Sequence, residues 1–394
     1  MTLPLADPHS VGLSPERCAR LGEVLRAEVA RGRMPGAVAL VARHGRVALV
    51  ESVGVLDPAH GDPMTVDAIF RLYSMTKPIV SVAALMLMEQ GRFLLADPVE
   101  KHLPEFAGQQ VAVERDGAVV LEPVRQPATV QDLMRHTAGL TYEFSGEGPV
   151  QRYYREHGLD SPQPGRDNAS YCRALARAPL MLQPGTEAEY SRATDVLGRL
   201  VEVWSGQPLG SFLRQHVFDP LGMRDTGFWV PPAQQHRIAE PFAHDPEGGV
   251  PMRMREVRVP PAMESGGGGL VGTAMDYARF AQMLLDGGHF GGQRLLGPRT
   301  VDYLRADHLG RIPARATLLD PGEGFGLGVA VRLATGVTQV PGSPGTFYWS
   351  GMGGTSFFID PAEQLVGVLM VLAPNQRGWY RQLFRNLVYA AIVE

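Results

Sequence analysis

The segment from residue 74 to residue 88 constrains the fold more than any other part of the sequence. Residues 78–88 include a single polar side chain, and Gly91 follows as a helix stop. A helix that is apolar on nearly every side has to be buried between other elements. Ser74 and Lys77 are three residues apart at its start, so both side chains lie on one face if the helix begins near Ser74. The sequence therefore predicts a buried central helix with a serine and a lysine in its first turn.

This serine and lysine suit nucleophilic catalysis. A serine hydroxyl is a weak nucleophile until a nearby base takes its proton, and a lysine in a desolvated site can lose its charge and help. Lysine occurs only at positions 77 and 101, whereas 35 of the 37 Lys and Arg residues are arginine, which cannot deprotonate. The alternative is structural: Ser74 caps the helix and Lys77 extends to water. The four-residue pattern by itself leaves both interpretations open.

Two further groups of residues can supply catalytic or binding side chains. Tyr190 stands just before a predicted apolar helix, where its phenol can act as a base beside a lysine; the alternative is a core tyrosine. Trp349, Ser350 and Gly351 fall in a predicted edge strand, where glycine lets the backbone approach a ligand closely. Trp349 has its own structural alternative, as an ordinary core aromatic residue.

A long loop is expected at residues 141–168, which are rich in Gly, Pro, Tyr and Arg. Loops of this length usually serve a functional site. Tyr142 and Phe144 are therefore candidates to line an acyl pocket, although packing within the loop explains them nearly as well.

Strands are expected at both ends of the chain and helices in the middle. The predicted strands are 36–42, 47–50, 326–333, 346–350, 355–359 and 365–372. The predicted helices include 14–30, 129–135, 194–204, 209–217, 273–285 and 379–393, of which three have a Ser14, Thr129 or Thr273 N-cap. From about residue 97 to 260 the pattern is helical with long loops.

The simplest assembly of these elements belongs to the α/β (α+β) class. One antiparallel sheet is built from the two ends of the chain and flanked by helices, with a mainly helical part to one side. We expect residues 1–73 and 262–394 to form the sheet domain. Residues 74–261 form the mainly helical domain that carries the Ser74 helix.

Composition argues against several other classes of protein. The net charge of −4 gives no sign of a nucleic-acid partner or an anionic membrane. The two cysteines, Cys18 and Cys172, make no disulfide framework, and no Cys or His pattern has metal-ligand spacing, so we expect neither a metal nor a cofactor. The N-terminus lacks a charged and apolar leader and the apolar runs are short, so we expect a cytoplasmic protein that spans no membrane.

Three short motifs in order carry a resemblance to a known family. They are Ser74-Met-Thr-Lys77, Tyr190-Ser-Arg192 and Trp349-Ser-Gly351. Over roughly residues 15–390, the chain resembles the serine β-lactamase and penicillin-recognising superfamily. Within it, the chain is most similar to class C β-lactamase-like serine esterases, the family VIII carboxylesterases. The resemblance implies a β-lactamase/transpeptidase-like fold, with the active site in the cleft between the sheet domain and the 74–261 domain.

The resemblance also implies roles for individual residues. Ser74 attacks an ester carbonyl, and Tyr190 with Lys77 takes the serine proton and passes it to the leaving alcohol. The backbone N–H groups of Ser74 and Met352 form the oxyanion hole. Which of Tyr190 and Lys77 is the base stays open, because the two would titrate as a coupled pair.

Two departures from the family pattern bear on the substrate. Arg192 replaces an asparagine that helps β-lactamases bind the substrate amide, and Trp349 replaces a lysine that attracts a β-lactam carboxylate. A lost cation and an added apolar ring disfavour an anionic substrate and favour a neutral acyl or alcohol group. We therefore expect a serine carboxylesterase that acts on short- to medium-chain esters, with a small-molecule ester as its partner.

Other functions remain open within the same chemistry. An acyltransferase would use an alcohol or amine in place of water, and a weak β-lactamase or D-amino-acid peptidase would act on amides. A penicillin-binding-like sensor would be acylated and never turn over. The physiological ester, the stereoselectivity and the oligomeric state do not follow from the sequence.

Overall fold

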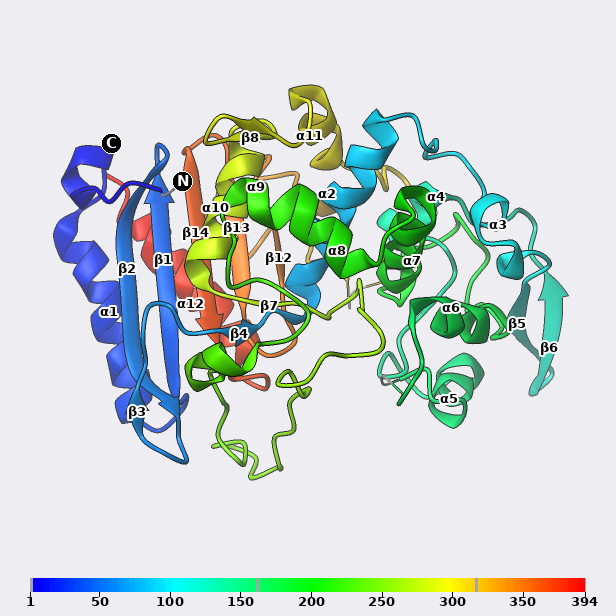
Figure 1. Cartoon of the computed structure of the whole chain (residues 1–394), viewed down its shortest axis with the longest axis horizontal. Helices are drawn as coiled ribbons and strands as arrows, with labels where there is room; N and C mark the ends of the chain where they lie inside the picture. Colours follow the sequence, from blue (N-terminus) through cyan, green and yellow to red (C-terminus); the bar gives the residue numbers. More distant parts are fainter. Residues whose placement is uncertain (1–2, 161–162, 316–317, 394) are drawn as a thin grey trace.

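The computed structural model describes residues 3–160, 163–315 and 318–393. Its framework is an antiparallel eight-stranded sheet in the order β10-β11-β12-β13-β14-β1-β2-β3 (Figure 1). In that order the strands are Glu323–Phe325, Ala330–Arg332, Phe347–Ser350, Ser356–Asp360, Leu365–Val371, Gly36–Arg43, Arg46–Asp57 and Asp62–Pro63. The first strand, β1, pairs with the last, β14, in a register from Ala37 opposite Val371 to Arg43 opposite Leu365. This confirms the prediction of one antiparallel sheet built from the two ends of the chain.

Helices cover both faces of this sheet. Helices α1 (Pro15–Ala30) and α12 (Arg377–Ala390) pack on one face, and α2 (Thr76–Glu89) and α10 (Ala274–Leu285) lie on the other (Figure 1). Every residue of β1 is buried, because successive side chains point to opposite faces and both faces are covered. Val38, Leu40 and Ala42 enter the core beside α2 and α10, whereas Ala37, Ala39 and Val41 pack toward α1 and α12.

Most of the mainly helical part lies on the side of α2 away from the sheet (Figure 1). Its helices are α3 (Val99–His102), α4 (Val130–Met134), α5 (Pro149–Glu156), α6 (Asn168–Ala176), α7 (Ala193–Ser205), α8 (Leu209–Leu213) and α9 (Asp219–Leu221). Helix α2 packs against α7 of the helical part. The hydrophobic core cluster that contains the α2 side chains also contains side chains of the sheet. The apolar helix therefore lies between the two parts, as its sequence predicts. The domain division at residues 73/74 and 261/262 stays a prediction.

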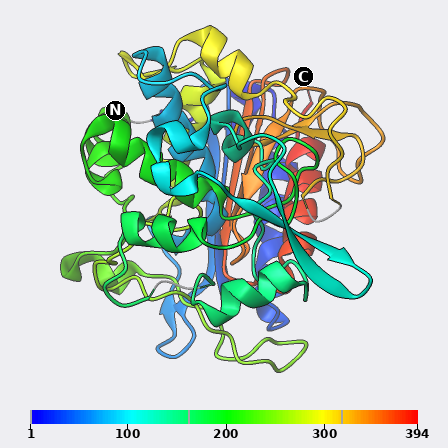
Figure 2. The same ribbon diagram turned by 90° about the vertical axis from the view of Figure 1, so that its right-hand side faces the viewer.

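Two segments of the helical part differ from expectation. A hairpin of β5 (Gln110–Arg115) and β6 (Ala118–Pro123) projects from the surface, where a helix or loop was expected (Figure 2). Its turn is Asp116-Gly117, with φ of 52° and 76°, which is the left-handed geometry of a tight hairpin. Helix α5 lies within the expected loop at 141–168, and Pro149 occupies its first turn.

Two strand predictions also need correction. Of the strand expected at 326–333, only β11 (Ala330–Arg332) forms. The chain turns between it and the preceding β10 (Glu323–Phe325), and Gly328 in this turn has a φ of 93°. The strand that carries Trp349 is not an edge strand, since β12 pairs with β11 and β13. Its pairing with β11 stops at Tyr348, however, so the end of β12 has a partner strand on one side.

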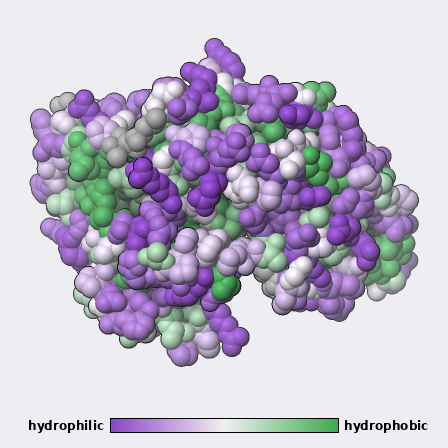
Figure 3. Space-filling view, in the orientation of Figure 1, coloured by the Kyte–Doolittle hydropathy of each residue, from purple (hydrophilic) through white to green (hydrophobic). Residues whose placement is uncertain are grey.

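The remaining strands and α-helix of the described residues are short. They are β4 (Phe70–Arg71) paired with β7 (Val271–Gly272), β8 (His289–Phe290) paired with β9 (Gln293–Arg294), and α11 (Pro298–Leu304). Cys18 and Cys172 are both free and buried, as expected. No helix among the described residues is long and apolar enough to cross a membrane. The space-filling view shows a mainly hydrophilic face with an indented lower edge (Figure 3).

Asp97 makes the stability of the fold depend on pH in the acidic range. Its carboxylate contacts Lys101 Nζ at 2.7 Å, the backbone N–H of Leu94 at 3.0 Å and His102 Nε2 at 3.1 Å. Burial raises the pKa of Asp97, but these contacts outweigh burial and lower the pKa to about 2. An unfolded aspartate titrates near pH ~4. The stabilisation is therefore complete above about pH 4 and is lost as the pH falls toward 2.

We expect Asp97→Asn to lower the free energy of unfolding by about 1 kcal/mol at pH 7, and by less as the pH falls below 4. Urea unfolding at pH 7, 4 and 3 measures the difference. Asp116→Asn is the matched control, because Asp116 is an exposed turn residue with a φ of 52° that asparagine also adopts. A difference for Asp97→Asn that stays constant from pH 7 to 3 would contradict the assigned role.

Candidate active site

Ser74 lies in a tight turn between β4 and α2. A single 3₁₀ turn, Tyr73–Met75, joins the two elements, and Tyr73 has a left-handed φ of 47°. This backbone is unfavourable for a tyrosine, so the surrounding structure has to hold it. The Tyr73 hydroxyl donates to Met254 Sδ at 3.1 Å and accepts from the backbone N–H of Arg255 at 3.3 Å. Met254 and Arg255 thus hold the turn in place.

Ser74, Lys77 and Tyr190 come together at this turn. The hydroxyl oxygens of Tyr190 and Ser74 lie 2.5 Å apart, and Lys77 Nζ lies 3.3 Å from Ser74 Oγ. Lys77 Nζ also lies over the Tyr190 ring, 4.6 Å from its centroid. A hydroxyl with a phenol and an amine in contact is the arrangement that proton removal from serine requires.

Lys77 is fully buried and held by two further groups. Its Nζ donates to the hydroxyl oxygen of Tyr142 at 2.9 Å and to the carbonyl of Gly267 at 2.6 Å. The peptide N–H of Gly267 in turn donates to Asp195 Oδ1 at 2.9 Å. Asp195, at the start of α7, therefore holds Gly267, the residue whose carbonyl accepts the hydrogen bond from Lys77.

The protonation states of Tyr142 and His136 bear on which group removes the proton from Ser74. Burial raises the pKa of Tyr142 well above its usual value, and the nearby Tyr190 and Asp195 raise it further. Burial also lowers the pKa of His136, and the charge of Lys77 adds to this shift. Tyr142 is therefore a neutral phenol and His136 a neutral imidazole at pH 7. His136 packs edge-on against the Tyr190 ring, with centroids 5.0 Å apart, and so supports that ring.

The third motif lies at the end of β12. Trp349 is 8% exposed, and its ring packs against Tyr190 and Phe325 with centroids 5.5 and 5.3 Å away. Gly351 donates its N–H to Thr355 at 2.8 Å. A Cβ on Gly351 would lie 2.4 Å from the carbonyl oxygen of Leu72. The close approach that glycine permits here is to the backbone before Ser74, whereas the sequence suggested an approach to a ligand.

Gly351→Ala is expected to lower the free energy of unfolding by about 1–3 kcal/mol, the usual cost of overpacking, because the methyl group meets backbone atoms. It should also lower kcat, since the shift displaces β12 from the serine turn. Thermal unfolding and ester kinetics measure the two effects. Gly378→Ala is the control, because a Cβ there meets no atom within 4 Å. Equal melting temperatures for the two variants would contradict the argument.

A cavity of about 1280 Å³ opens over Ser74. Its lining includes the expected residues Ser74, Tyr142, Phe144, Tyr190, Trp349, Ser350, Gly351 and Met352. Lys77 lies beneath this surface. Phe144 is 60% exposed and stacks on Tyr142 with centroids 4.7 Å apart. The structure thus brings all of the predicted site residues together. The expected oxyanion hole at Ser74 and Met352 stays a prediction.

Arg192 lines the same cavity, but its side chain is held by contacts with neighbouring residues of the cavity wall. It donates to Glu143 Oε2 at 2.8 Å and to the carbonyl of Asp160 at 2.6 Å. Its guanidinium also lies over the Tyr142 ring, 4.7 Å from the centroid. The residue therefore orders the wall that contains Tyr142.

Several residues of the site have no sequence signal. Asp195 and Gly267 support Lys77 from positions far apart in the chain, and Arg255 and Arg381 line the cavity. Arginine is common throughout this chain, so no pattern distinguishes these two. In the part of the chain that the structure describes, no group of three or more His, Cys, Asp or Glu side chains could hold a metal ion.

The sheet flanked by helices and the Ser74, Lys77 and Tyr190 cluster are those of a penicillin-recognising serine enzyme. The family model described as Beta-lactamase matches residues 21–385, and the chain belongs to this family. It is 36% identical to Esterase EstB of Burkholderia gladioli over 415 aligned residues, which cover 99% of this chain and 100% of that protein. This confirms the resemblance to the esterase branch that the motifs indicate.

Other relatives fit the same family. Protein Rv1367c of Mycobacterium tuberculosis (strain ATCC 25618 / H37Rv) is 36% identical over 356 residues, 86% of each chain. Among solved structures, EstCE1, described as a hydrolase with promiscuous acyltransferase activity, superimposes with a TM-score of 0.78 at 31% identity, covering 95% of this chain and 99% of that chain. The β-lactamase/transpeptidase-like fold expected from the sequence is confirmed.

Proposed function

We propose that this protein is a serine carboxylesterase that hydrolyses short- to medium-chain esters through an acyl-enzyme on Ser74. One observation carries the proposal: Ser74 Oγ lies 2.5 Å from the Tyr190 hydroxyl and 3.3 Å from Lys77 Nζ at the base of a large cavity. The likeness to Esterase EstB over the whole chain supports the same class of enzyme.

The proposed reaction uses these contacts together with the roles that the resemblance implies. Ser74 Oγ attacks the ester carbonyl carbon while its proton passes to the coupled Tyr190 and Lys77 pair. The backbone N–H groups of Ser74 and Met352 hold the negative charge that develops on the carbonyl oxygen. The C–O bond to the alcohol then breaks, and the pair returns the proton to the leaving alcohol. Water attacks the acyl-enzyme by the reverse of these steps and releases the carboxylic acid.

Trp349 supports an ester over a β-lactam as substrate. It occupies the position at which the resemblance places the lysine of β-lactamases, and its ring packs beside Tyr190. The cavity contains residues from both predicted domains, such as Tyr142 and Trp349. We therefore also propose that the cavity is the cleft between the 74–261 domain and the sheet domain, and that a small-molecule ester enters there.

The test compares two substrates on the native protein. We expect sustained hydrolysis of p-nitrophenyl butyrate and little hydrolysis of a chromogenic cephalosporin. Strong cephalosporin turnover would contradict the argument from Trp349. A stoichiometric burst of p-nitrophenol without further turnover would instead identify a sensor that is acylated once.

Acyl transfer is a second candidate function. The structural relative EstCE1 is described as having promiscuous acyltransferase activity, and it covers almost the whole of this chain. The acyl-enzyme on Ser74 would then react with an alcohol in place of water. The test adds a primary alcohol to the p-nitrophenyl butyrate assay. The amount of new ester relative to butyrate gives the ratio of acyl transfer to hydrolysis. A product that is butyrate alone at high alcohol concentration excludes transfer.

A further inference from the structure

The cavity above Ser74 has an excess of positive charge. Six arginines and four carboxylates line it, although the whole chain has a net charge of −4. Of these six arginines, only Arg192 forms an ion pair with another of the described residues. The other five arginines of the lining form no ion pair with a carboxylate of the described residues, and this differs from the neutral site that the loss of a lysine at Trp349 suggested.

Arg255 is the most firmly placed of these cations. Its backbone N–H donates to the Tyr73 hydroxyl at 3.3 Å, and its carbonyl accepts from Arg71 Nε at 2.7 Å. Arg71 itself pairs with Glu240, at 2.9 Å between Nη1 and Oε2. The residue before it, Met254, contacts Tyr73 through its sulfur. Arg255 is thus anchored on the serine turn from both sides of its backbone.

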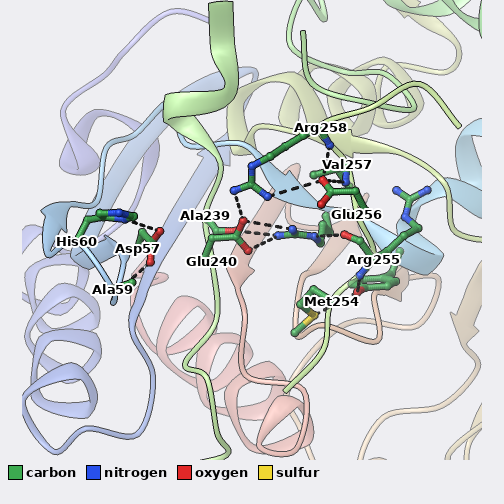
Figure 4. A network of polar contacts seen from close by, with 12 residues as sticks. Asp57, Ala59, His60, Ala239, Glu240, Met254, Arg255, Glu256, Val257 and Arg258 are labelled. Carbon is green, nitrogen blue, oxygen red and sulfur yellow. Dashed lines mark hydrogen bonds and ion pairs between the residues drawn. The ribbon is translucent and has the colours of Figure 1, made fainter. Parts of the chain in front are cut away.

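The side chain of Arg255 lacks an acidic partner. Its Nη2 donates to the carbonyl of Gly269, and its buried Nε has no hydrogen-bond partner. In Figure 4 its guanidinium points away from Glu240, which Arg71 and Arg258 occupy. Burial lowers its pKa to about 10, so it is charged at pH 7. Arg255 is half-buried, and a guanidinium with a buried, unpartnered Nε and no carboxylate partner is costly, which points to a bound anion as its missing partner.

We propose that the cavity selects esters that carry a carboxylate group, and that Arg255 binds this carboxylate. The proposal rests on the esterase function of the same cavity. Arginine presents a planar fork that matches a carboxylate, and charge-assisted hydrogen bonds are the strong ones. Arg255 lies beside the loop that ends at Gly269, so an anion held there is close to the Tyr73 and Ser74 turn. The carboxylate can belong to the acyl part or to the alcohol part of the ester.

Two matched pairs of esters distinguish these sources. Mono-p-nitrophenyl adipate against p-nitrophenyl hexanoate places the carboxylate on the acyl part. 4-Carboxyphenyl butyrate against phenyl butyrate places it on the alcohol part. We expect the native protein to prefer the anionic member of one pair by at least tenfold in kcat/KM. Equal values within both pairs, or a preference for both neutral members, would overturn the proposal.

The variants Arg255→Gln and Arg255→Lys assign the preference to this residue. We expect Arg255→Gln to reduce the anionic-to-neutral ratio of kcat/KM by roughly 10- to 100-fold, mainly through KM, and Arg255→Lys to restore part of it. Arg20→Gln, in an exposed part of α1, is the matched control and should leave the ratio unchanged. Labelling of Ser74 by a neutral fluorophosphonate confirms that each variant is folded.

Arg381 provides the strongest competing explanation. It donates to the carbonyl of Gly351, and its Nε also has no partner. A preference that Arg381→Gln removes and Arg255→Gln leaves intact would overturn the role of Arg255. Failure of the esterase function itself is distinct, because then none of the four esters is hydrolysed, or their hydrolysis survives Ser74→Ala.

Discussion

Ser74→Ala is expected to abolish ester hydrolysis, with a loss in kcat/KM of roughly 10,000-fold or more, because no acyl-enzyme can form without the hydroxyl. The fold should persist, since the backbone contacts of the turn do not involve this side chain. Steady-state kinetics with p-nitrophenyl butyrate measure the loss. Mass spectrometry after fluorophosphonate treatment should find the adduct on the native protein and none on the variant.

Ser81→Ala is the matched control for this experiment. Ser81 lies in α2, the helix that follows the Ser74 turn, is 1% exposed, and its hydroxyl makes no hydrogen bond. It is not part of the cavity lining. The same chemical change should therefore leave turnover close to that of the native protein. Unchanged turnover in Ser74→Ala would exclude Ser74 as the nucleophile.

Tyr190→Phe is expected to reduce kcat by about 1,000-fold, within the range of a lost general base. The phenylalanine ring fills the same space beside Trp349 and His136, so the variant should fold. Only the hydroxyl that lies 2.5 Å from Ser74 Oγ is removed. KM should change little, because the loss falls on proton transfer.

Tyr142→Phe makes the same change at the neighbouring tyrosine. Its hydroxyl contacts Lys77 at 2.9 Å, and its raised pKa keeps it protonated. We therefore expect a smaller loss in kcat, about tenfold, through the position of Lys77. Single-turnover kinetics of both variants separate acylation from deacylation. A larger loss for Tyr142→Phe than for Tyr190→Phe would reverse the assignment of the two phenols.

The parts of the fold that local chemistry determines could be predicted from sequence. Ser14, Thr129 and Thr273 each cap a helix that the structure contains, with the side-chain oxygen accepting a backbone N–H three residues on. The Asp116-Gly117 dipeptide is likewise a local signal, in this case for a hairpin turn. Its two strands, however, lie in a region whose overall sequence pattern is helical. The turn between β10 and β11 contains Gly328, where a Cβ would meet Ser81 of α2, and local pattern does not reveal such a contact.

The site shows the same limit. Ser74 and Lys77 are close in sequence, so helix geometry alone brings them to one face. Tyr142 and Gly267 meet Lys77 from 65 and 190 residues away, and the anchoring of Arg255 by Arg71 spans 184 residues. Such contacts depend on the complete tertiary structure. The motifs therefore locate the nucleophile, whereas the charges of its cavity appear only in three dimensions.

The pairing of β1 with β14 has a consequence for biosynthesis. The ribosome makes β1 (ending at Arg43) long before β14 (beginning at Leu365), so the apolar edge of β1 waits for its partner while all of the chain between them is made. Edge strands of this kind attract other chains. Because α2 packs in the same core as β1, the serine turn reaches its final form only when the C-terminal strands have joined the sheet. A nascent chain that stops short of residue 365 would thus be inactive and prone to aggregation.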